Sequence, residues 1–262
     1  VEEFGESRVI DTPLAEAAIA GIAIGTAIKG LRPIAEIEFA DFIWPAVNQI
    51  IGEAARVRYG TKGAVGLPMV IRAPYGGGIR GGLYHSQSVE AYFAHTPGLK
   101  VVTPSNPYDT KGLLKSAIRD NDPVVFLEHK KTYRLVRGEV PDGDYTIPIG
   151  KADVKRSGTD ISFITYGLMV HYCLEAAEML QEQGYSVEVV DLRTVRPIDY
   201  ATVIDSVKKT NRLVIVEEAW PLASISTEVA YKVQREAFDY LDAPIQRVTM
   251  RDVPMSYAAN LV

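Results

Sequence analysis

Short runs of β-branched and apolar residues alternate with stretches of helical periodicity along almost the whole chain. Apolar runs of about four to eight residues bounded by Gly, Pro, Asn or Asp are typical of buried strands. This alternation predicts an α/β fold in which parallel sheets are covered by helices on both faces. Strands are predicted at 8–10, 33–39, 68–72, 99–102, 123–128, 160–166, 186–192, 213–217 and 245–250, and helices at 14–29, 42–59, 88–94, 108–119, 170–183, 201–209 and 224–238.

The alternation is interrupted once, over residues 130–150, where the sequence is polar, contains proline and has no periodicity. Such a stretch is typical of a connection between two compact units. We therefore predict two doubly wound domains, residues 1–145 and residues 146–262. Because the chain starts and ends abruptly, at Val1 and Val262, we expect each domain to lack part of its terminal sequence.

The first predicted helix, residues 14–29, is apolar on nearly every side, so we expect it to be buried. Thr12, which is followed by proline, would open it as the N-cap. Ala17, Gly21 and Gly25 recur at four-residue spacing and form a thin face on which another element can pack closely.

Composition and charge narrow the function classes. The chain has 262 residues, 47% of them hydrophobic, and this length is sufficient for two cores. A net charge of -5 argues against nucleic acid as the main partner. No apolar stretch is long enough to span a bilayer, and no targeting segment is visible. The single cysteine, Cys173, fits a reducing compartment, so we expect a cytoplasmic protein in a bacterium or a mitochondrial matrix protein in a eukaryote.

The stretch 75–88 carries five glycines followed by His85 and is the first candidate for a functional site. Glycines let the backbone approach a ligand closely, and loops of this kind are either functional or mobile. The glycine spacing also matches the dinucleotide-binding fingerprint. That fingerprint needs an acid at the end of the next strand, and the next apolar run, residues 99–102, is followed by Thr-Pro.

Glu16 is the second candidate, because it is the only charge before the last residue of the first predicted helix. An acid in the first turn of a helix favours the helix dipole, which is a purely structural interpretation. A carboxyl group flanked by Leu14 and alanines would instead be desolvated. Desolvation raises the pKa of a carboxyl group, which suits a residue that shares a proton with a ligand.

A series of short motifs spreads in order over nearly the whole chain, such as Asp-Thr-Pro-Leu-Ala-Glu at 11–16 and Leu-Tyr-His-Ser-Gln-Ser at 83–88. Others lie at 40–42, 98–102, 111–114, 117–120, 191–194 and 208–210. Together they resemble the β subunit of the E1 component of 2-oxo acid dehydrogenase complexes, in the transketolase-like superfamily of thiamine diphosphate enzymes. An ordered set of this kind is more specific than any single motif.

The resemblance implies roles for four residues. Glu16 would hydrogen-bond the aminopyrimidine ring of thiamine diphosphate, so that the cofactor acts as its own base, and Leu14 and Phe42 would contact that ring. His85 would orient the substrate carboxylate and support proton transfer to a lipoyl group. On the residues alone, Phe42 is equally well a core aromatic, and a structural loop histidine is the alternative interpretation of His85.

The resemblance also implies partners. The chain would join an α subunit in an α2β2 heterotetramer, act on a 2-oxo acid and pass the acyl group to a lipoyl acyltransferase, E2. The motif at 83–88 favours a branched-chain substrate, with pyruvate or acetoin dehydrogenases as alternatives. The superfamily's Mg²⁺ and diphosphate motif is missing, so the α subunit would hold Mg²⁺. A nucleotide-dependent oxidoreductase and a non-catalytic scaffold subunit remain as other function classes.

By the same resemblance, a monovalent cation such as K⁺ would be bound by main-chain carbonyls and by acidic or amide oxygens after a helix end, where the helix dipole favours a cation. A solvated turn before Pro123 is the alternative interpretation. The predicted ligands are Leu67, Met69, Val70, Ala117, Ile118, Asp120 and Asp122.

Overall fold

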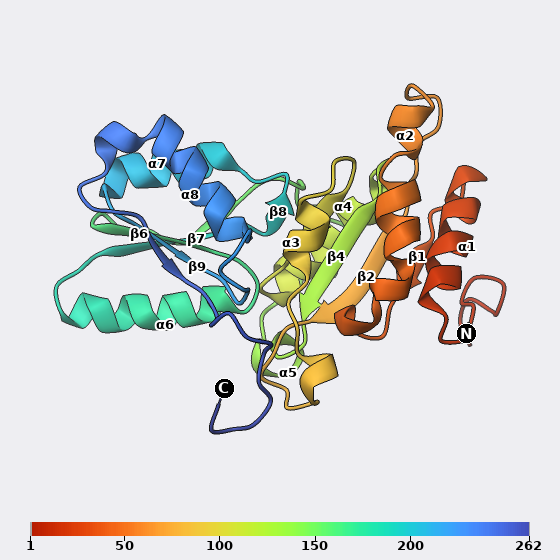
Figure 1. Cartoon of the computed structure of the whole chain (residues 1–262), viewed down its shortest axis with the longest axis horizontal. Coiled ribbons are helices and arrows are strands. Elements are labelled where there is room, and N and C mark those ends of the chain that lie inside the picture. Colours follow the sequence, from red (N-terminus) through yellow and green to blue (C-terminus); the bar gives the residue numbers. More distant parts are fainter. Residues whose placement is uncertain (1, 262) are drawn as a thin grey trace.

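Two five-stranded sheets lie side by side in the computed structural model, which describes residues 2–261, and each sheet is covered by helices (Figure 1). The strand orders are β1-β2-β4-β3-β8 and β10-β9-β6-β7-β5. The α/β fold class predicted from the alternating pattern is confirmed. Between residues 2 and 261, none of the helices is long and apolar enough to cross a membrane.

In the first sheet, four strands run parallel and one edge strand runs antiparallel. Every residue of the central strand β4 is buried, which explains the apolar run over its first four residues. The antiparallel edge strand comes from the second half of the chain and is too short to be predicted from periodicity. The strands are β1 Ile34–Glu36, β2 Val70–Tyr75, β4 Val124–His129, β3 Lys100–Val102 and the antiparallel β8 Thr194–Arg196.

The second sheet has the same plan, with four parallel strands and an antiparallel edge strand, β5. Its strands are β10 Gln246–Val248, β9 Leu213–Val216, β6 Ile161–Thr165, β7 Val187–Asp191 and β5 Asp153–Arg156. Both edge strands contradict a purely parallel arrangement. An antiparallel strand at the edge of a parallel sheet is common in folds of this class.

The helices lie on the faces of the sheets (Figure 1). In α4, for example, Leu113 and Ala117 are buried, and the Asn106 side chain caps the helix by accepting a hydrogen bond from the Asp109 N–H. The α-helices are α1 Glu16–Ile28, α2 Val57–Gly60, α3 Glu90–Ala94, α4 Pro107–Arg119, α5 Thr132–Leu135, α6 Met169–Glu182, α7 Tyr200–Thr210 and α8 Ile225–Glu236. Short 3₁₀ turns are η1 Ala40–Phe42, η2 Trp44–Ala46, η4 Leu83–His85 and η5 Phe238–Tyr240, and η3 Asn48–Ala54 is π-helical.

The first helix, α1, differs from its prediction in two ways. It begins at Glu16 with Ala15 as the N-cap, so the predicted cap at Thr12 is wrong. Its burial is also one-sided, since Ile22 is 57% exposed and Ile28 is 48% exposed. The rest of the chain covers only one side of this helix, through Ala20, Ala23 and Ala27.

Two further predicted elements are wrong. Residues 8–10 form no strand, because the N–H groups of Arg8 and Val9 donate to the Gly5 carbonyl and turn the chain. The predicted helix over 42–59 is broken into η1, η2, η3 and α2. Pro45 lies in η2, and a proline inside a helix removes a donor and breaks the helical hydrogen-bond ladder.

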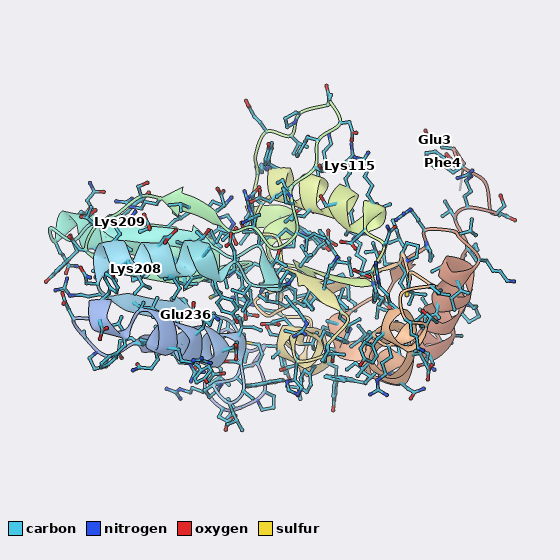
Figure 2. All side chains as sticks on the ribbon, turned by 90° about the horizontal axis from the view of Figure 1, so that it is seen from above. Glu3, Phe4, Lys115, Lys208, Lys209 and Glu236 are labelled. Carbon is cyan, nitrogen blue, oxygen red and sulfur yellow. The ribbon has the colours of Figure 1, made fainter. Side chains whose placement is uncertain are left out.

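The two halves share one continuous hydrophobic core, which includes Ile71 and Leu127 of the first sheet and Ile164 and Val190 of the second. Seen from above, Glu3 and Phe4 lie at one end of the elongated molecule and Lys208 and Lys209 near the other (Figure 2).

The carboxyl ends of strands from both sheets meet in the middle of the molecule. Gly167 follows β6, has a φ of +59° and lies so close to Tyr75 at the end of β2 that a Cβ would overlap the phenol oxygen. A glycine is therefore required where the two sheets touch.

Candidate functional site

Three rings form a cluster at the end of the first sheet. The His85 ring lies edge-on to Phe39, with a centroid distance of 4.6 Å, and edge-on to Phe42, at 5.3 Å. The two phenylalanine rings lie 5.8 Å apart at 84°. The cluster joins the two residues predicted as catalytic histidine and cofactor-stacking aromatic, although they are 43 positions apart in the sequence.

The topology explains why these residues meet. Phe42 ends η1, which follows β1, and His85 ends η4 in the loop that follows β2. Lys130 follows β4 directly. All three strands are parallel, so their carboxyl ends lie at one edge of the sheet, which is where ligands bind in open α/β folds.

The glycines of the loop 76–82 allow it to pack against neighbouring side chains. Gly76 has a φ of +88°, and a Cβ there would overlap the ring of His129. A Cβ on Gly77 would lie 2.8 Å from Met255, which is too close for any larger residue without a shift. The loop is thus seated on His129 and on the C-terminal segment, and the close approach of Gly76 to the His129 ring requires glycine.

A buried ion pair under this loop was missed by the sequence analysis. His129 Nε2 lies 3.1 Å from Glu218 Oε2, and Glu218 Oε1 also accepts from the Gly77 N–H at 2.7 Å and from the Ser88 hydroxyl at 3.2 Å. Burial by itself raises the pKa of Glu218, but these hydrogen bonds and the His129 charge hold its pKa below the usual range. Two adjacent acids at the end of a predicted strand, Glu217 and Glu218, were the signal that could have found it.

Lys130, which follows His129 in the sequence, contacts His85. Its ammonium donates to the main-chain carbonyl of His85 and lies 4.7 Å from the centre of the Phe39 ring. The side chain is buried, and burial lowers the pKa of Lys130 to about 8, although the nearby carboxylates of Asp41 and Glu218 oppose this shift. A cation with a lowered pKa therefore lies beside the three-ring cluster.

A second group of buried acids lies between the two sheets. Glu90 is fully buried, and Tyr166 donates to its Oε1 at 2.8 Å and to Glu217 Oε2 at 3.1 Å. Burial, with a smaller contribution from the neighbouring Glu217 and Glu218, raises the pKa of Glu90 to about 8, although the hydrogen bond from Tyr166 opposes this shift. Glu90 Oε2 has no hydrogen-bond partner among the described residues.

Glu16 and Leu14 lie at the amino end of α1, outside the three-ring cluster. Glu16 is partly exposed and Leu14 is 80% exposed, so the Glu16 carboxyl group is only partly desolvated in the single chain. Within residues 2–261, the side chain of Glu16 makes no hydrogen bond or ion pair with another residue that would hold it in a structural role. Its carboxylate is therefore available to a ligand or to a partner chain.

The residues predicted to bind a monovalent cation come together, since the Leu67 N–H donates to the Asn121 carbonyl at 2.9 Å. Their oxygens already face basic side chains. Arg32 donates to the carbonyls of Ile118 and Asp120, at 2.9 and 2.7 Å. The remaining contacts are Lys100 with Asp120 and Asp122, at 2.6 and 3.2 Å, and Arg58 with Asp122, at 2.6 Å.

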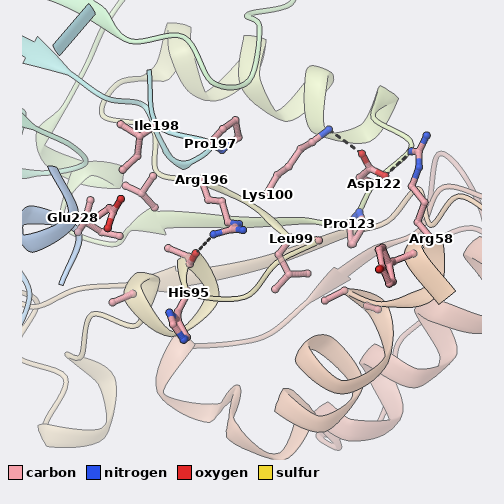
Figure 3. A pocket seen from close by; sticks show the side chains of 18 of the residues that line it. Arg58, His95, Leu99, Lys100, Asp122, Pro123, Arg196, Pro197, Ile198 and Glu228 are labelled. Carbon is pink, nitrogen blue, oxygen red and sulfur yellow. Dashed lines mark hydrogen bonds and ion pairs between the residues drawn. The ribbon is translucent and has the colours of Figure 1, made fainter. Parts of the chain in front are cut away.

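A cavity of about 1610 Å³ lies elsewhere (Figure 3). Its wall includes Lys100, the first residue of β3, and Pro123, which precedes β4, so it opens at the amino edge of the sheet. Neither Glu16, Phe42 nor His85 lines it. We place the candidate site at the carboxyl edge, because that edge joins the aromatic cluster, Lys130 and the buried acids.

Two alternatives lose support from the geometry. The dinucleotide fingerprint requires a helix that opens at the third glycine, whereas here the loop runs into the single turn η4 and the next helix starts at Glu90. A scaffold subunit would have Glu16 and His85 in purely structural pairs, and the Glu16 carboxylate has no such pair between residues 2 and 261.

Within the same range, no group of three or more His, Cys, Asp or Glu side chains could hold a metal ion.

Comparisons with known proteins identify the family. Residues 1–136 match the family model described as transketolase, pyrimidine binding domain, and residues 150–262 match transketolase, C-terminal domain. A solved structure described as "Split gene transketolase, inactive beta4 tetramer" aligns with a TM-score of 0.77 at 26% identity, over 94% of this chain and 76% of that chain.

Curated relatives are more similar still. The chain is 59% identical to the 2-oxoisovalerate dehydrogenase subunit beta of Bacillus subtilis, over 99% of this chain and 80% of the relative. It is 52% identical to the pyruvate dehydrogenase E1 component subunit beta of the same organism, over 99% of this chain and 81% of the relative, and 50% identical to that of Staphylococcus aureus, with the same shares covered. The chain therefore belongs to the transketolase-like family of E1 β subunits of 2-oxo acid dehydrogenases, thiamine diphosphate-dependent oxidoreductases that act together with an α subunit.

Proposed function

We propose that this chain is the β subunit of an E1 enzyme that decarboxylates a branched-chain 2-oxo acid and transfers the acyl group to a lipoyl group of E2. The contact between His85 and Phe42 at the carboxyl edge of the first sheet carries the proposal, because it places an acid-base side chain beside an aromatic surface. The higher identity to a 2-oxoisovalerate dehydrogenase subunit than to a pyruvate dehydrogenase subunit favours the branched-chain substrate.

The residues present fit the pyrimidine end of thiamine diphosphate. Leu14 and Phe42 supply apolar and aromatic surface, and the partly exposed Glu16 supplies a carboxylate without another partner in the described part of the chain. When bound, the cofactor supplies a carbon nucleophile and an electron sink for decarboxylation. Glu16 would hold a proton at its carboxylate, and Phe42 would orient the ring and exclude water.

The diphosphate end needs residues from elsewhere. A hard cation that bridges phosphates needs oxygen ligands on a fixed loop, and we propose that the α subunit supplies them for Mg²⁺ in an α2β2 assembly. A K⁺ ion at Leu67, Met69, Val70, Ala117, Ile118, Asp120 and Asp122 stays a prediction. It would have to displace the Arg32 guanidinium from the Ile118 and Asp120 carbonyls.

His85 has two tasks in this proposal. Its ring nitrogens can orient the carboxylate of the 2-oxo acid, and they can deliver a proton when a lipoyl sulfur accepts the acyl group. Lys130 and the two phenylalanine rings fix the position of the ring, so the proton is delivered from one place.

The test is co-expression with an α subunit encoded beside it, followed by decarboxylation assays on pyruvate and on branched-chain 2-oxo acids. We expect turnover only in the assembled enzyme, with the highest kcat/KM for the branched-chain acids. A preference for pyruvate would refute the substrate assignment, and an active isolated chain would refute the shared site.

A variant of His85 separates the two half-reactions. His85→Ala should impair acyl transfer to a lipoyl domain by about 10²–10⁴-fold, while decarboxylation measured with an artificial electron acceptor falls much less. Thermal stability and cofactor affinity are the controls, and both should stay near wild type. Equal losses in both half-reactions with weakened cofactor binding would mean that His85 only shapes the site.

A further inference from the structure

We propose that residues 251–257 form a strap that holds the glycine loop in place, and that Gln87 is the positioning residue through which the strap fixes His85. The strap comes from the C-terminal segment after β10, and the loop belongs to the first sheet, so the two lie about 170 residues apart in sequence. The role assigned to His85 rests on the proposed function, whereas the mechanical link between strap and loop does not.

The Gln87 side chain clasps the strap in both directions. The Met255 N–H donates to Gln87 Oε1 at 3.0 Å, and Gln87 Nε2 faces the Met255 carbonyl at 3.4 Å. The same Nε2 donates to the Leu83 carbonyl at 2.7 Å, and Leu83 begins the turn η4 that ends in His85. One amide group thus ties the strap to the turn that carries the histidine.

The main chain of Gln87 is held as well. Its carbonyl accepts from the Gly76 N–H at 3.1 Å, at the start of the glycine loop, and its N–H faces the carboxylate of Asp41 at 3.4 Å, in η1. Gln87 therefore connects η1, both ends of the glycine loop and the strap.

The Met255 side chain lies directly on the loop. A Cβ on Gly77 would lie 2.8 Å from two Met255 carbons and 3.0 Å from its sulfur. The Gly77 N–H also donates a hydrogen bond to Glu218 Oε1 at 2.7 Å. Since Glu218 and the strap both belong to the second half of the chain, the loop is gripped by that half at two points.

The other end of the strap is anchored on the second sheet. The Trp220 Nε1–H donates to the Val253 carbonyl at 2.8 Å, and the Met250 N–H donates to the Ala219 carbonyl at 3.0 Å. The side chains of the strap are open to solvent at Val253, which is 55% exposed, and at Tyr257, which is 51% exposed. Few contacts hold it, so loss of one hydrogen bond should change its opening equilibrium measurably.

The test measures opening of the loop without reference to activity. Arg80 lies in the loop, and trypsin cleavage after it reports the population in which the loop is open. Two variants each remove one attachment of the strap: Gln87→Met removes the clasp on Met255, and Trp220→Phe removes only the Val253 anchor. In the assembled enzyme, each should raise the rate of cleavage after Arg80 by about three- to tenfold.

The double variant supplies the decisive comparison. If both residues act through the strap, their effects on the rate of cleavage after Arg80 should not be independent. The fold-increase in the double variant, Gln87→Met with Trp220→Phe, should then be smaller than the product of the fold-increases in the two single variants. Cleavage after Lys62, at the opposite edge of the sheet, is the internal reference, and Gln183→Met, on an exposed glutamine, is the matched control. Both should stay at the wild-type rate.

Acyl transfer to a lipoyl domain is measured on the same enzymes. Both strap variants should lower its kcat about three- to tenfold with little change in the KM for the 2-oxo acid, because the position of His85 changes and not the substrate pocket. Unchanged cleavage after Arg80 in Trp220→Phe, or multiplicative effects in the double variant, would overturn the strap. Absence of 2-oxo acid turnover in the wild-type enzyme would overturn the proposed function and leave the cleavage comparison valid.

Discussion

Burial strongly shifts the pKa of one residue in this protein, Glu90. Its carboxyl group is fully buried, one oxygen has no partner between residues 2 and 261, and two other glutamates raise its pKa further. A neutral carboxylic acid is the form that such surroundings favour. The folded state keeps this proton at pH values where the unfolded chain has lost it, because an exposed glutamate is deprotonated above its ordinary pKa.

The pH dependence of stability follows from that pKa of about 8. Between about pH 4.5 and 8 the folded state holds a proton that the unfolded state has lost, so the free energy of unfolding falls as the pH rises, by about 1.4 kcal/mol per pH unit. Glu90→Gln removes this contribution. Urea unfolding of both proteins should be measured at pH 5, 6, 7 and 8. The free energy of unfolding of the variant, relative to that of the wild type, should increase up to about pH 8. The same pH dependence in both proteins would contradict the assignment.

Glu16 is the second residue whose chemistry can be tested alone. Glu16→Gln keeps the shape of the side chain and loses the shared proton. We expect thiamine diphosphate to remain bound to the assembled enzyme, while exchange of its C2 proton for deuterium slows by about 10²–10⁴-fold. Binding measured by calorimetry is the control. Unchanged exchange would reduce Glu16 to a residue that favours the helix dipole.

The helix α1 is only partly covered by the rest of the chain. Its inner side is buried through Ala20, Ala23 and Ala27, but its outer side exposes Ile22 and Ile28. Exposed apolar surface on a helix without polar cover is typical of an interface. Together with the small residues Ala17, Gly21 and Gly25, it suits close packing against the α subunit.

A charge on that surface tests the interface. Ile22→Glu should leave the isolated chain folded, because the side chain is 57% exposed, and should weaken assembly with the α subunit by at least about tenfold, because a charge would be buried without a partner. Sedimentation of the co-expressed chains measures it. Met179→Glu, on the 65% exposed Met179 of α6, is the control and should assemble normally.

At the scale of the whole molecule, the two halves are tied by a network of charges. Arg193, which follows β7, donates to the buried Asp109 of α4 at 2.7 Å and to Asp153 of β5 at 2.8 Å. Burial raises the pKa of Asp109, but Lys155 and Arg193 together hold it below its usual range. Its contribution to stability is therefore present at neutral pH and is lost as the pH falls through the lowered pKa.

Removal of the arginine should destabilise the whole chain. Arg193→Leu leaves Asp109 with fewer partners inside the protein and should lower the free energy of unfolding by about 3–5 kcal/mol. Arg212→Leu, which breaks only the exposed pair with Asp242, should cost at most about 1 kcal/mol. Thermal unfolding at pH 7 compares the two, and similar losses in both variants would argue against a central role of the network.

The order of strands and helices could be predicted from the sequence, because hydrophobic periodicity is a local property. The buried strand β4 begins with the apolar run 124–127, and the motif that contains His85 sits in a glycine loop directly after a predicted strand. Family membership followed from the same local motifs.

Only the tertiary structure decided what depends on contacts between distant residues. The edge strand β8, the ion pair of His129 with Glu218 and the clasp of Gln87 on Met255 each join segments from different parts of the chain. No local periodicity encodes such pairs, since their partners are brought together by the meeting of two sheets at their carboxyl ends. The exposed side of α1 was mispredicted for the same physical reason: an apolar sequence indicates that a surface needs cover, and the fold determines whether this chain or a partner supplies it.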